Sequence, residues 1–454
     1  MVYTIVDVLL EMFSFTFLVR AFVVGILVSL CASLLGLSLV MKRYSMIGDG
    51  LSHVGFGALA IATAFHTAPL YFSIPIVVAA AFLLLRLSEN SKIKGDAAIA
   101  LISTSSLAIG VVIISQTTGM NTDVCNYMFG SILAMSKNDV YLSVILSVTV
   151  LILFIFFYHK IFAITFDESF AKAGGVKTGT YNMLIALLTA LTIVLGMRMM
   201  GAMLISSLII FPALSAMRVF KRFKTVTICS AIIAVTCFSI GLVISYLYAT
   251  PAGASVVLMN IITFLIFWAI SVIIHKNPRR NRMIKKIALA SIAALLLITS
   301  CGNGKNDAEQ AANAGAKAAE EIELSLPDGV DLVIREKMFI AQVNDVYLNS
   351  DDYIGKRIKL EGIFMDMFSG GSRYCFVIRN GPGCCGSDGQ IGFEVSWNPP
   401  GQIMLEKREY PKRNAWVEAQ GVLSEYEESG TNFLYLALTD LNVLEKRGAE
   451  FVTQ

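Results

Sequence analysis

Charged residues are scarce in this chain of 454 residues: they make up 15% of it, whereas 56% of its residues are hydrophobic and the mean hydropathy is +0.69. A soluble enzyme needs more polar surface than this, so the composition excludes that class and places most of the chain in a lipid bilayer. The net charge of +3 averages an apolar half and a polar half. We therefore expect no nucleic-acid partner.

Three further features are missing. The pattern Gly-x4-Gly-Lys-Ser/Thr of a phosphate-binding loop is absent, so any nucleotide hydrolysis must come from another chain. Residues 322–454 contain no histidine and nothing that resembles a catalytic triad. Asp7 and Glu11 stand where a signal peptide would carry basic residues, which predicts no cleavable signal at the start. We expect no catalytic activity from this chain itself.

What the chain does contain is a succession of apolar runs up to about His275. With about 20 residues needed for each crossing, they predict a polytopic all-α bundle of about eight or nine transmembrane helices. The second run is short and fits a helix better if it begins near Met46. The runs lie at residues 14–40, 53–66, 69–87, 97–117, 140–158, 180–197, 201–219, 225–248 and 254–275.

Basic residues gather in alternate loops between these runs, and such a bias marks the cytoplasmic side. The opposite side has only Lys137 and Arg198. The pattern predicts a multi-pass protein of a bacterial cytoplasmic (inner) membrane with its N-terminus outside. The residues on the basic side are Lys42, Arg43, Arg86, Lys92, Lys94, His159, Lys160, Lys172, Lys177, Arg218, Lys221, Arg222, Lys224, Lys276, Arg279, Arg280, Arg282, Lys285 and Lys286.

Two potential metal ligands, Asp49 and His53, lie at the start of the second run. Four residues apart on a helix, they occupy one face and can share a cation. Glycines at 48, 50, 55 and 57 are expected to leave that face uncrowded. Ionisable residues in apolar spans are costly and suggest function. A purely structural alternative has Asp49 as a helix cap and His53 making a single hydrogen bond.

The longest basic-side loop, residues 164–179, predicts a short surface helix. Asp167 and Glu168 stand at its acidic start, Ala171 lies in its middle, and Gly174 and Gly175 end it. Such a helix could dock into a partner, or it could be only an interfacial connector.

Several ordered motifs resemble one family. The stretch 43–57, with Gly-Asp-Gly-Leu-Ser-His at 48–53, is similar to the signature of the integral membrane subunits of ABC importers for zinc, manganese or iron. The resemblance covers about residues 10–275. Further matching motifs lie at residues 127–133, 188–192, 200–213 and 250–258.

The resemblance implies partners and roles. Members of this family work as a permease homodimer in membrane lipid, with a cytoplasmic ABC ATPase and an extracytoplasmic metal-binding protein. Asp49 and His53 match the family's acidic and histidine positions in the second helix, which contact the metal. Residues 167–175 fall where the ATPase-coupling helix is expected. A divalent zinc, manganese or iron ion would be cargo, with no tightly bound cofactor.

After the last apolar run, residues 279–301 contain a basic stretch, a short apolar run and small residues before Cys301. This arrangement resembles a bacterial lipoprotein signal, in which Cys301 would be lipidated and the chain cut before it; a tethering helix is the alternative. The expected domains are therefore a permease domain (1–278), this signal or tether (279–301), a linker (302–321) and an extracytoplasmic domain (322–454).

The last domain shows alternating apolar and polar residues broken by Gly and Pro, which predicts a small all-β barrel of the oligonucleotide/oligosaccharide-binding (OB) type. Cys375, Cys384 and Cys385 could form a disulfide plus a free thiol, or a thiolate metal site. The expected strands lie at residues 357–364, 374–378, 391–395, 415–423 and 434–438.

Together these features predict a metal-cation importer permease, with zinc preferred, joined to an accessory domain. The alternative from another class is a membrane-anchored thiol redox or structural assembly protein that uses the three cysteines. A permease for a larger metal chelate is a third possibility, for which more spans and an aromatic-lined path would be expected.

Overall fold

The computed structural model describes residues 11–65, 69–90, 95–116, 135–248, 250–276, 329–369, 372–381, 389–398, 410–428 and 431–452. The chain divides into two compact units. One is helical and comprises residues 19–132 and 137–302; the other comprises residues 1–18, 133–136 and 303–454 and holds the β-sheet. The expected signal or tether (279–301), with Cys301, and the linker (302–321) lie outside the described residues.

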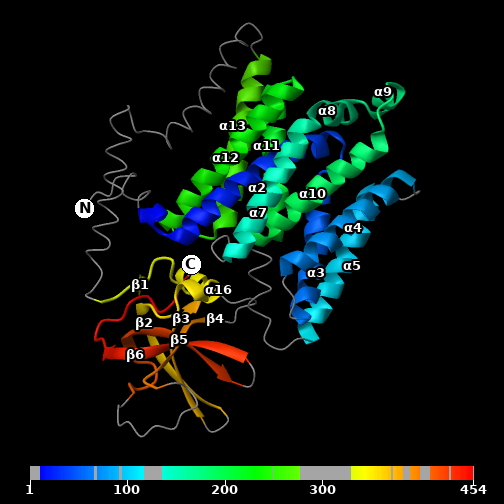
Figure 1. Cartoon of the computed structure of the whole chain (residues 1–454). Helices are drawn as coiled ribbons and strands as arrows, with labels where there is room; N and C mark the ends of the chain where they lie inside the picture. Colours follow the sequence, from blue (N-terminus) through cyan, green and yellow to red (C-terminus); the bar gives the residue numbers. More distant parts are fainter. Residues whose placement is uncertain are drawn as a thin grey trace. The chain divides into compact units, whose positions relative to one another are not determined.

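A helix occupies each of the nine predicted apolar runs in the part of the chain that the structure describes (Figure 1). α3 begins at Ile47, close to the start expected near Met46, so His53 lies inside the helix. The helices are α2 (Thr16–Met41), α3 (Ile47–Ala64), α4 (Pro69–Asn90), α5 (Gly95–Gln116), α7 (Lys137–Phe156), α10 (Thr178–Met200), α11 (Ala202–Val219), α12 (Phe223–Tyr248) and α13 (Ala252–Lys276).

Within the described residues, six helices are long and apolar enough to cross a membrane, by length and composition: α2, α5, α7, α10, α12 and α13. The others, α3, α4 and α11, contain shorter apolar stretches, at Ile47–Ala62, Phe72–Leu87 and Ile205–Val219. The helical membrane architecture is therefore confirmed, whereas the expected count of eight or nine crossings is not.

Two groups of helices meet at α11. Leu37 of α2, Ala213 of α11, Cys229 and Cys237 of α12 and Phe267 of α13 share one buried apolar cluster. On its other side, α11 packs against α3 and α10, and α3 in turn packs against α4 and α5. Figure 1 shows the same division, with α12 and α13 on one side of the unit and α4 and α5 on the other. α11 thus connects the helix that carries Asp49 and His53 to the rest of the unit.

The closest approach of α2 and α11 depends on Gly36. A Cβ at this position would lie 1.9 Å from the Ile209 carbonyl oxygen, so a Gly36→Ala variant forces the two helices apart. We expect it to lower the stability of the full chain by about 1–3 kcal/mol, the usual cost of overpacking. Thermal unfolding of the detergent-purified protein measures the change.

Gly179→Ala on α10 is the matched control, because nothing lies within 4 Å of the added methyl group. It should be neutral or slightly stabilising, since alanine favours a helix over glycine. Equal melting temperatures for the two variants would contradict the expected clash at Gly36.

The second unit contains a six-stranded sheet in the order β1-β2-β3-β4-β6-β5, and an additional pairing of β2 with β5 closes it into a barrel. β4 and β6 pair in parallel, with Glu394 opposite Tyr435, and β1 pairs in parallel with β2. All five expected strands are present, and the β-barrel-like fold is confirmed. The strands are β1 (Leu332–Ile334), β2 (Arg357–Ser369), β3 (Ser372–Gly381), β4 (Gly389–Ser396), β5 (Trp416–Glu428) and β6 (Thr431–Val443).

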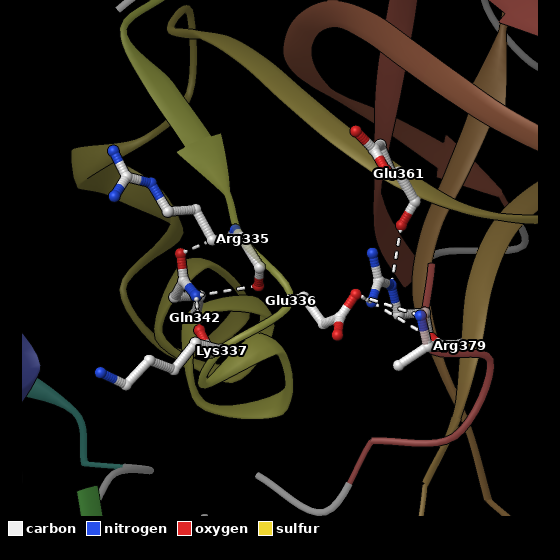
Figure 2. A network of polar contacts seen from close by, with 7 residues as sticks. Arg335, Glu336, Lys337, Gln342, Glu361 and Arg379 are labelled. Atoms are coloured by element: carbon white, nitrogen blue, oxygen red, sulfur yellow. Dashed lines mark hydrogen bonds and ion pairs between the residues drawn. The ribbon is translucent and has the colours of Figure 1, made fainter. Parts of the chain in front are cut away.

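The expectation of an all-β domain misses helix α16 (Phe339–Leu348), which follows β1 and precedes the 3-10 turn η2 (Ser350–Asp352). Phe339, Val343 and Val346 recur at helical spacing and enter the barrel core. The buried Gln342 side chain fixes the start of the helix: its amide nitrogen donates to the Lys337 carbonyl at 2.8 Å (Figure 2). Two β-branched valines make this segment a poor helix by propensity, so tertiary packing decides it.

A buried arginine packs between aromatic side chains of the second unit. Arg379 on β3 is 2% exposed and lies between the rings of Phe339 and Trp416, at 4.9 and 5.0 Å from their centroids. Its guanidinium donates to the Glu361 carbonyl at 2.9 Å and to the Glu336 carboxylate at 3.2 Å (Figure 2). It also donates to the Ala449 carbonyl at 3.1 Å. The buried cation therefore has three hydrogen-bond acceptors as well as two aromatic neighbours.

The carboxylate beside Arg379 responds to pH. The Ala449 N–H donates to Glu336, and together with Arg379 this lowers the pKa of Glu336 below its ordinary value. Because the folded pKa lies below the unfolded one, the contribution to stability is present at neutral pH and is lost as the pH falls through the acid range.

Candidate metal site and coupling segment

The side chains of Asp49 and His53 lie one turn apart on α3. His53 Nε2 and Asp49 Oδ2 are 3.7 Å apart, which is beyond hydrogen-bond distance and leaves the lone pairs of both groups for another partner. In the single chain the side chains are 21% exposed for His53 and 45% exposed for Asp49. The geometry can place a carboxylate and an imidazole around one cation.

Asp49 is not the residue that caps this helix. α3 begins at Ile47, so Asp49 is its third residue and lies in the first turn. An acidic group there interacts favourably with the helix dipole, by about 0.3–1 kcal/mol, but it does not replace a cap. The cap that the structural alternative assigned to Asp49 is therefore wrong.

The glycines of α3 do not leave an open face, as the sequence suggested. Each one faces a neighbouring helix: Gly50 and Gly57 face α5, Gly55 faces α10 and Gly48 faces α11. A Cβ on Gly57, for example, would lie 2.7 Å from the Ser106 carbonyl oxygen. The glycines therefore let three helices pack closely around α3, and they fix its position instead of clearing space beside the two ligands.

One chain supplies an incomplete ligand set. Within the described residues, no group of three or more His, Cys, Asp or Glu side chains could hold a metal ion. Two protein ligands are fewer than the four of a closed structural zinc site. Any cation bound here needs further ligands, from water or from another chain.

The predicted surface helix is present as α9 (Glu168–Ala173), which follows α8 (Tyr158–Phe166) at one end of the helical unit (Figure 1). Asp167 caps it: the Phe170 N–H donates to Asp167 Oδ1 at 2.9 Å. Gly174 follows the last helical residue, and Gly175 takes a φ of +81°, which favours glycine. Ala171 is the buried contact of the helix, whereas Phe170 is exposed.

α9 is anchored by three polar side chains from three parts of the chain. The Lys42 ammonium lies 3.2 Å from one Glu168 oxygen and also donates to the Asn182 side-chain oxygen. The Asn182 side-chain nitrogen donates to the other Glu168 oxygen at 2.8 Å. From the sequence, Lys42 indicated only the cytoplasmic side and Glu168 only the acidic start of a helix. Asn182 was not predicted. Nothing local links them, because Lys42 precedes these partners by 126 and 140 residues.

Of the three predicted thiol residues of the second unit, the structure describes Cys375. Cys375 is buried in the barrel core, and burial raises its pKa to about 11. At neutral pH it is therefore a protonated thiol that packs as a small apolar side chain. Cys384 and Cys385 lie outside the described residues.

These observations define a polytopic helical protein with a polar pair in one apolar helix and a separate capped surface helix. Residues 14–271 match the ABC 3 transport family, and the chain belongs to that family. The resemblance drawn from the motifs is thereby confirmed. Residues 309–452 match the DUF1980 C-terminal domain.

Curated relatives and one solved structure resemble the membrane half. The chain is 32% identical over 237 residues to the high-affinity zinc uptake system membrane protein ZnuB of Buchnera aphidicola, covering 52% of this chain and 90% of the relative. It is 28% identical over 274 residues to the manganese import system permease protein ScaB of Streptococcus gordonii, covering 60% and 96%. The structure of PsaBC from Streptococcus pneumoniae in complex with Fab matches with a TM-score of 0.53 and 29% identity, covering 58% of this chain and 95% of that one.

Proposed function

We propose that this chain is the permease subunit of an ATP-driven importer of divalent metal cations. The observation that carries the proposal is the pair Asp49 and His53, held one turn apart in an apolar helix of an ABC 3 family member. A carboxylate and an imidazole suit zinc, manganese or iron, and relatives are named for zinc and manganese transport. Zinc is the first candidate, because imidazole is among its preferred ligands.

The incomplete ligand set fits transport better than storage. A site on a path must bind firmly enough to admit the ion and weakly enough to release it. A second copy of the chain would add another Asp49 and His53, which supports a homodimer with four ligands about its axis. ATP hydrolysis would come from a separate cytoplasmic ATPase docked on α9, and a separate extracytoplasmic protein would deliver the ion.

The proposed topology counts α3, α4 and α11 as crossings, giving eight or nine, with the N-terminus and the β-domain outside. Packing supports this, since α3 and α11 lie among helices that are themselves long enough to span. The proposal keeps the boundaries at 278, 301 and 321 and the lipidation of Cys301. The closed strand order with a parallel β4–β6 pair supports an OB-like barrel for the last domain.

The proposal is tested by metal accumulation in cells that lack their own high-affinity importers. They express the full chain with its ATPase and binding protein, and uptake of zinc, manganese and iron is measured separately. We expect uptake of one of these ions, and its loss in an Asp49→Ala/His53→Ala double variant that still inserts in the membrane. No uptake of any of the three by the inserted wild-type chain would overturn the proposal.

A thiol redox or assembly role is the less favoured reading. Burial keeps Cys375 protonated at neutral pH, which opposes its use as a thiolate nucleophile. Uptake that survives the double variant but fails on replacement of Cys375, Cys384 and Cys385 would reverse this preference.

A further inference from the structure

The anchor of α9 is a closed triangle of polar side chains. Glu168 divides its two oxygens between Lys42 and Asn182, and Asn182 divides its amide oxygen and nitrogen between Lys42 and Glu168. The Lys42 side chain is 11% exposed and Asn182 is buried, so two of the three groups are shielded from water. Hydrogen bonds to charged groups in such surroundings are stronger than exposed ones, and each group fixes the orientation of the other two.

Lys42 also stands at the entrance to the metal-site helix. Only the connection formed by residues 42–46 separates α2 from α3. This connection is a hydrogen-bonded turn: Tyr44 N–H donates to the Leu39 carbonyl at 2.9 Å, and Ile47 N–H donates to the Tyr44 carbonyl at 3.0 Å. Arg43 takes a left-handed φ of 64°, which few residues other than glycine adopt.

A short turn held in this way transmits displacement better than a flexible loop does. Lys42 is bonded through its side chain to α9, and its backbone leads within seven residues to Asp49. Gly48 and Gly50 in the first turn of α3 pack against α11 and α5, so the turn that carries Asp49 is in close contact and a displacement at residues 42–46 acts directly on it.

We propose that Lys42 is a positioning residue that joins the ATPase-docking helix α9 to the metal-site helix α3, through Glu168 and Asn182. When the ATPase moves α9, the ammonium group carries that displacement into the α2–α3 turn and so to Asp49 and His53. This inference rests on the proposed function and adds to it a route from the docking helix to the ligands, through residues that touch neither the ion nor the nucleotide.

The direct test follows α3 itself in the complete transporter. Amide hydrogen exchange at residues 47–53 is measured in the assembled complex with its ATPase, with and without ATP, for wild type and for Lys42→Met. We expect ATP to change exchange at α3 in the wild type and the change to be lost in the variant. The methionine keeps the length of the stem but removes the bonds to Glu168 and Asn182.

Two further variants separate transmission from simple stabilisation. Lys177→Met removes an exposed lysine from the loop that follows α9 and should leave the ATP-dependent change intact. The charge reversal Lys42→Glu/Glu168→Lys restores an ion pair and should recover part of the change. Metal uptake by Lys42→Met should fall about 2- to 30-fold, as expected for a residue that carries coupling energy, while its assembly with the ATPase is unchanged.

The outcomes are distinguishable. An ATP-dependent change at α3 that persists in Lys42→Met, or that is absent from the wild type, overturns the inference whatever ion is carried. Loss of assembly or of melting temperature in Lys42→Met without recovery in the charge reversal also overturns it, because the triangle would then be only structural. Absence of metal uptake by the wild type, with the exchange pattern as expected, counts against the proposed cargo and not against the route.

Discussion

Asp49→Asn is expected to abolish most metal uptake while the chain still folds and assembles. Asparagine keeps the shape of the side chain, but it removes the negative charge and replaces one oxygen ligand with an NH2 group that cannot bind a cation. Loss of a partner that only supports a ligand already costs about 10- to 100-fold in metal affinity, so loss of a ligand itself should cost at least as much. Uptake at limiting metal concentration measures the effect.

The asparagine variant also separates a ligand from a helix-end residue. In the first turn of α3, Asn would lose only the interaction of the charge with the helix dipole, about 0.3–1 kcal/mol, so a structural role would survive the change. Asp139→Asn is the matched control, since Asp139 occupies the first turn of α7 as Asp49 does that of α3. Uptake by Asp49→Asn equal to that of Asp139→Asn would remove Asp49 from the metal path.

The helices could be predicted from the sequence, because an apolar run long enough to cross a membrane almost always forms a helix. The start of α3 near Met46 and the acidic start of α9 at Asp167 and Glu168 could also be predicted, since both depend on residues within one turn. The strands of the barrel followed from alternation, which reports which face is buried. These features are local, and local signals are what a single sequence contains.

The missing features depend on residues far apart in the chain. Lys42 and Asn182 meet across 140 residues, and no pattern near either one indicates the other. The glycines of α3 are adjacent in sequence to the ligands, but their role is decided by α5, α10 and α11, which occupy the space that the sequence suggested was open. The burial of Arg379 likewise required the closed barrel, since arginine alone predicts an exposed position.

That buried arginine gives the largest stability effect expected in the second unit. Arg379→Ala should destabilise the β-barrel by about 2–5 kcal/mol, the usual cost of emptying the space of a large buried side chain. The Glu336 carboxylate that it pairs with is 55% exposed, so loss of the ion pair adds little. The change empties the space between Phe339 and Trp416 and removes the hydrogen bonds that the Glu361 and Ala449 carbonyls accept. Amide hydrogen exchange of strands β2 and β3 in the full chain measures the loss without separating the two units.

Arg373→Ala is the matched control, because Arg373 lies on the same strand and also pairs with a carboxylate, Asp366, at 2.9 Å. Its side chain is 40% exposed, so the pair is worth at most about 1 kcal/mol and β2 and β3 should keep nearly all their protection. Glu336→Gln should fall between the two, since its amide oxygen can still accept from Arg379 and from Ala449. If the amide protection of β2 and β3 is the same in Arg379→Ala as in Arg373→Ala, water must replace the guanidinium. The closed barrel would then depend on the β2–β5 pairing and the apolar core alone.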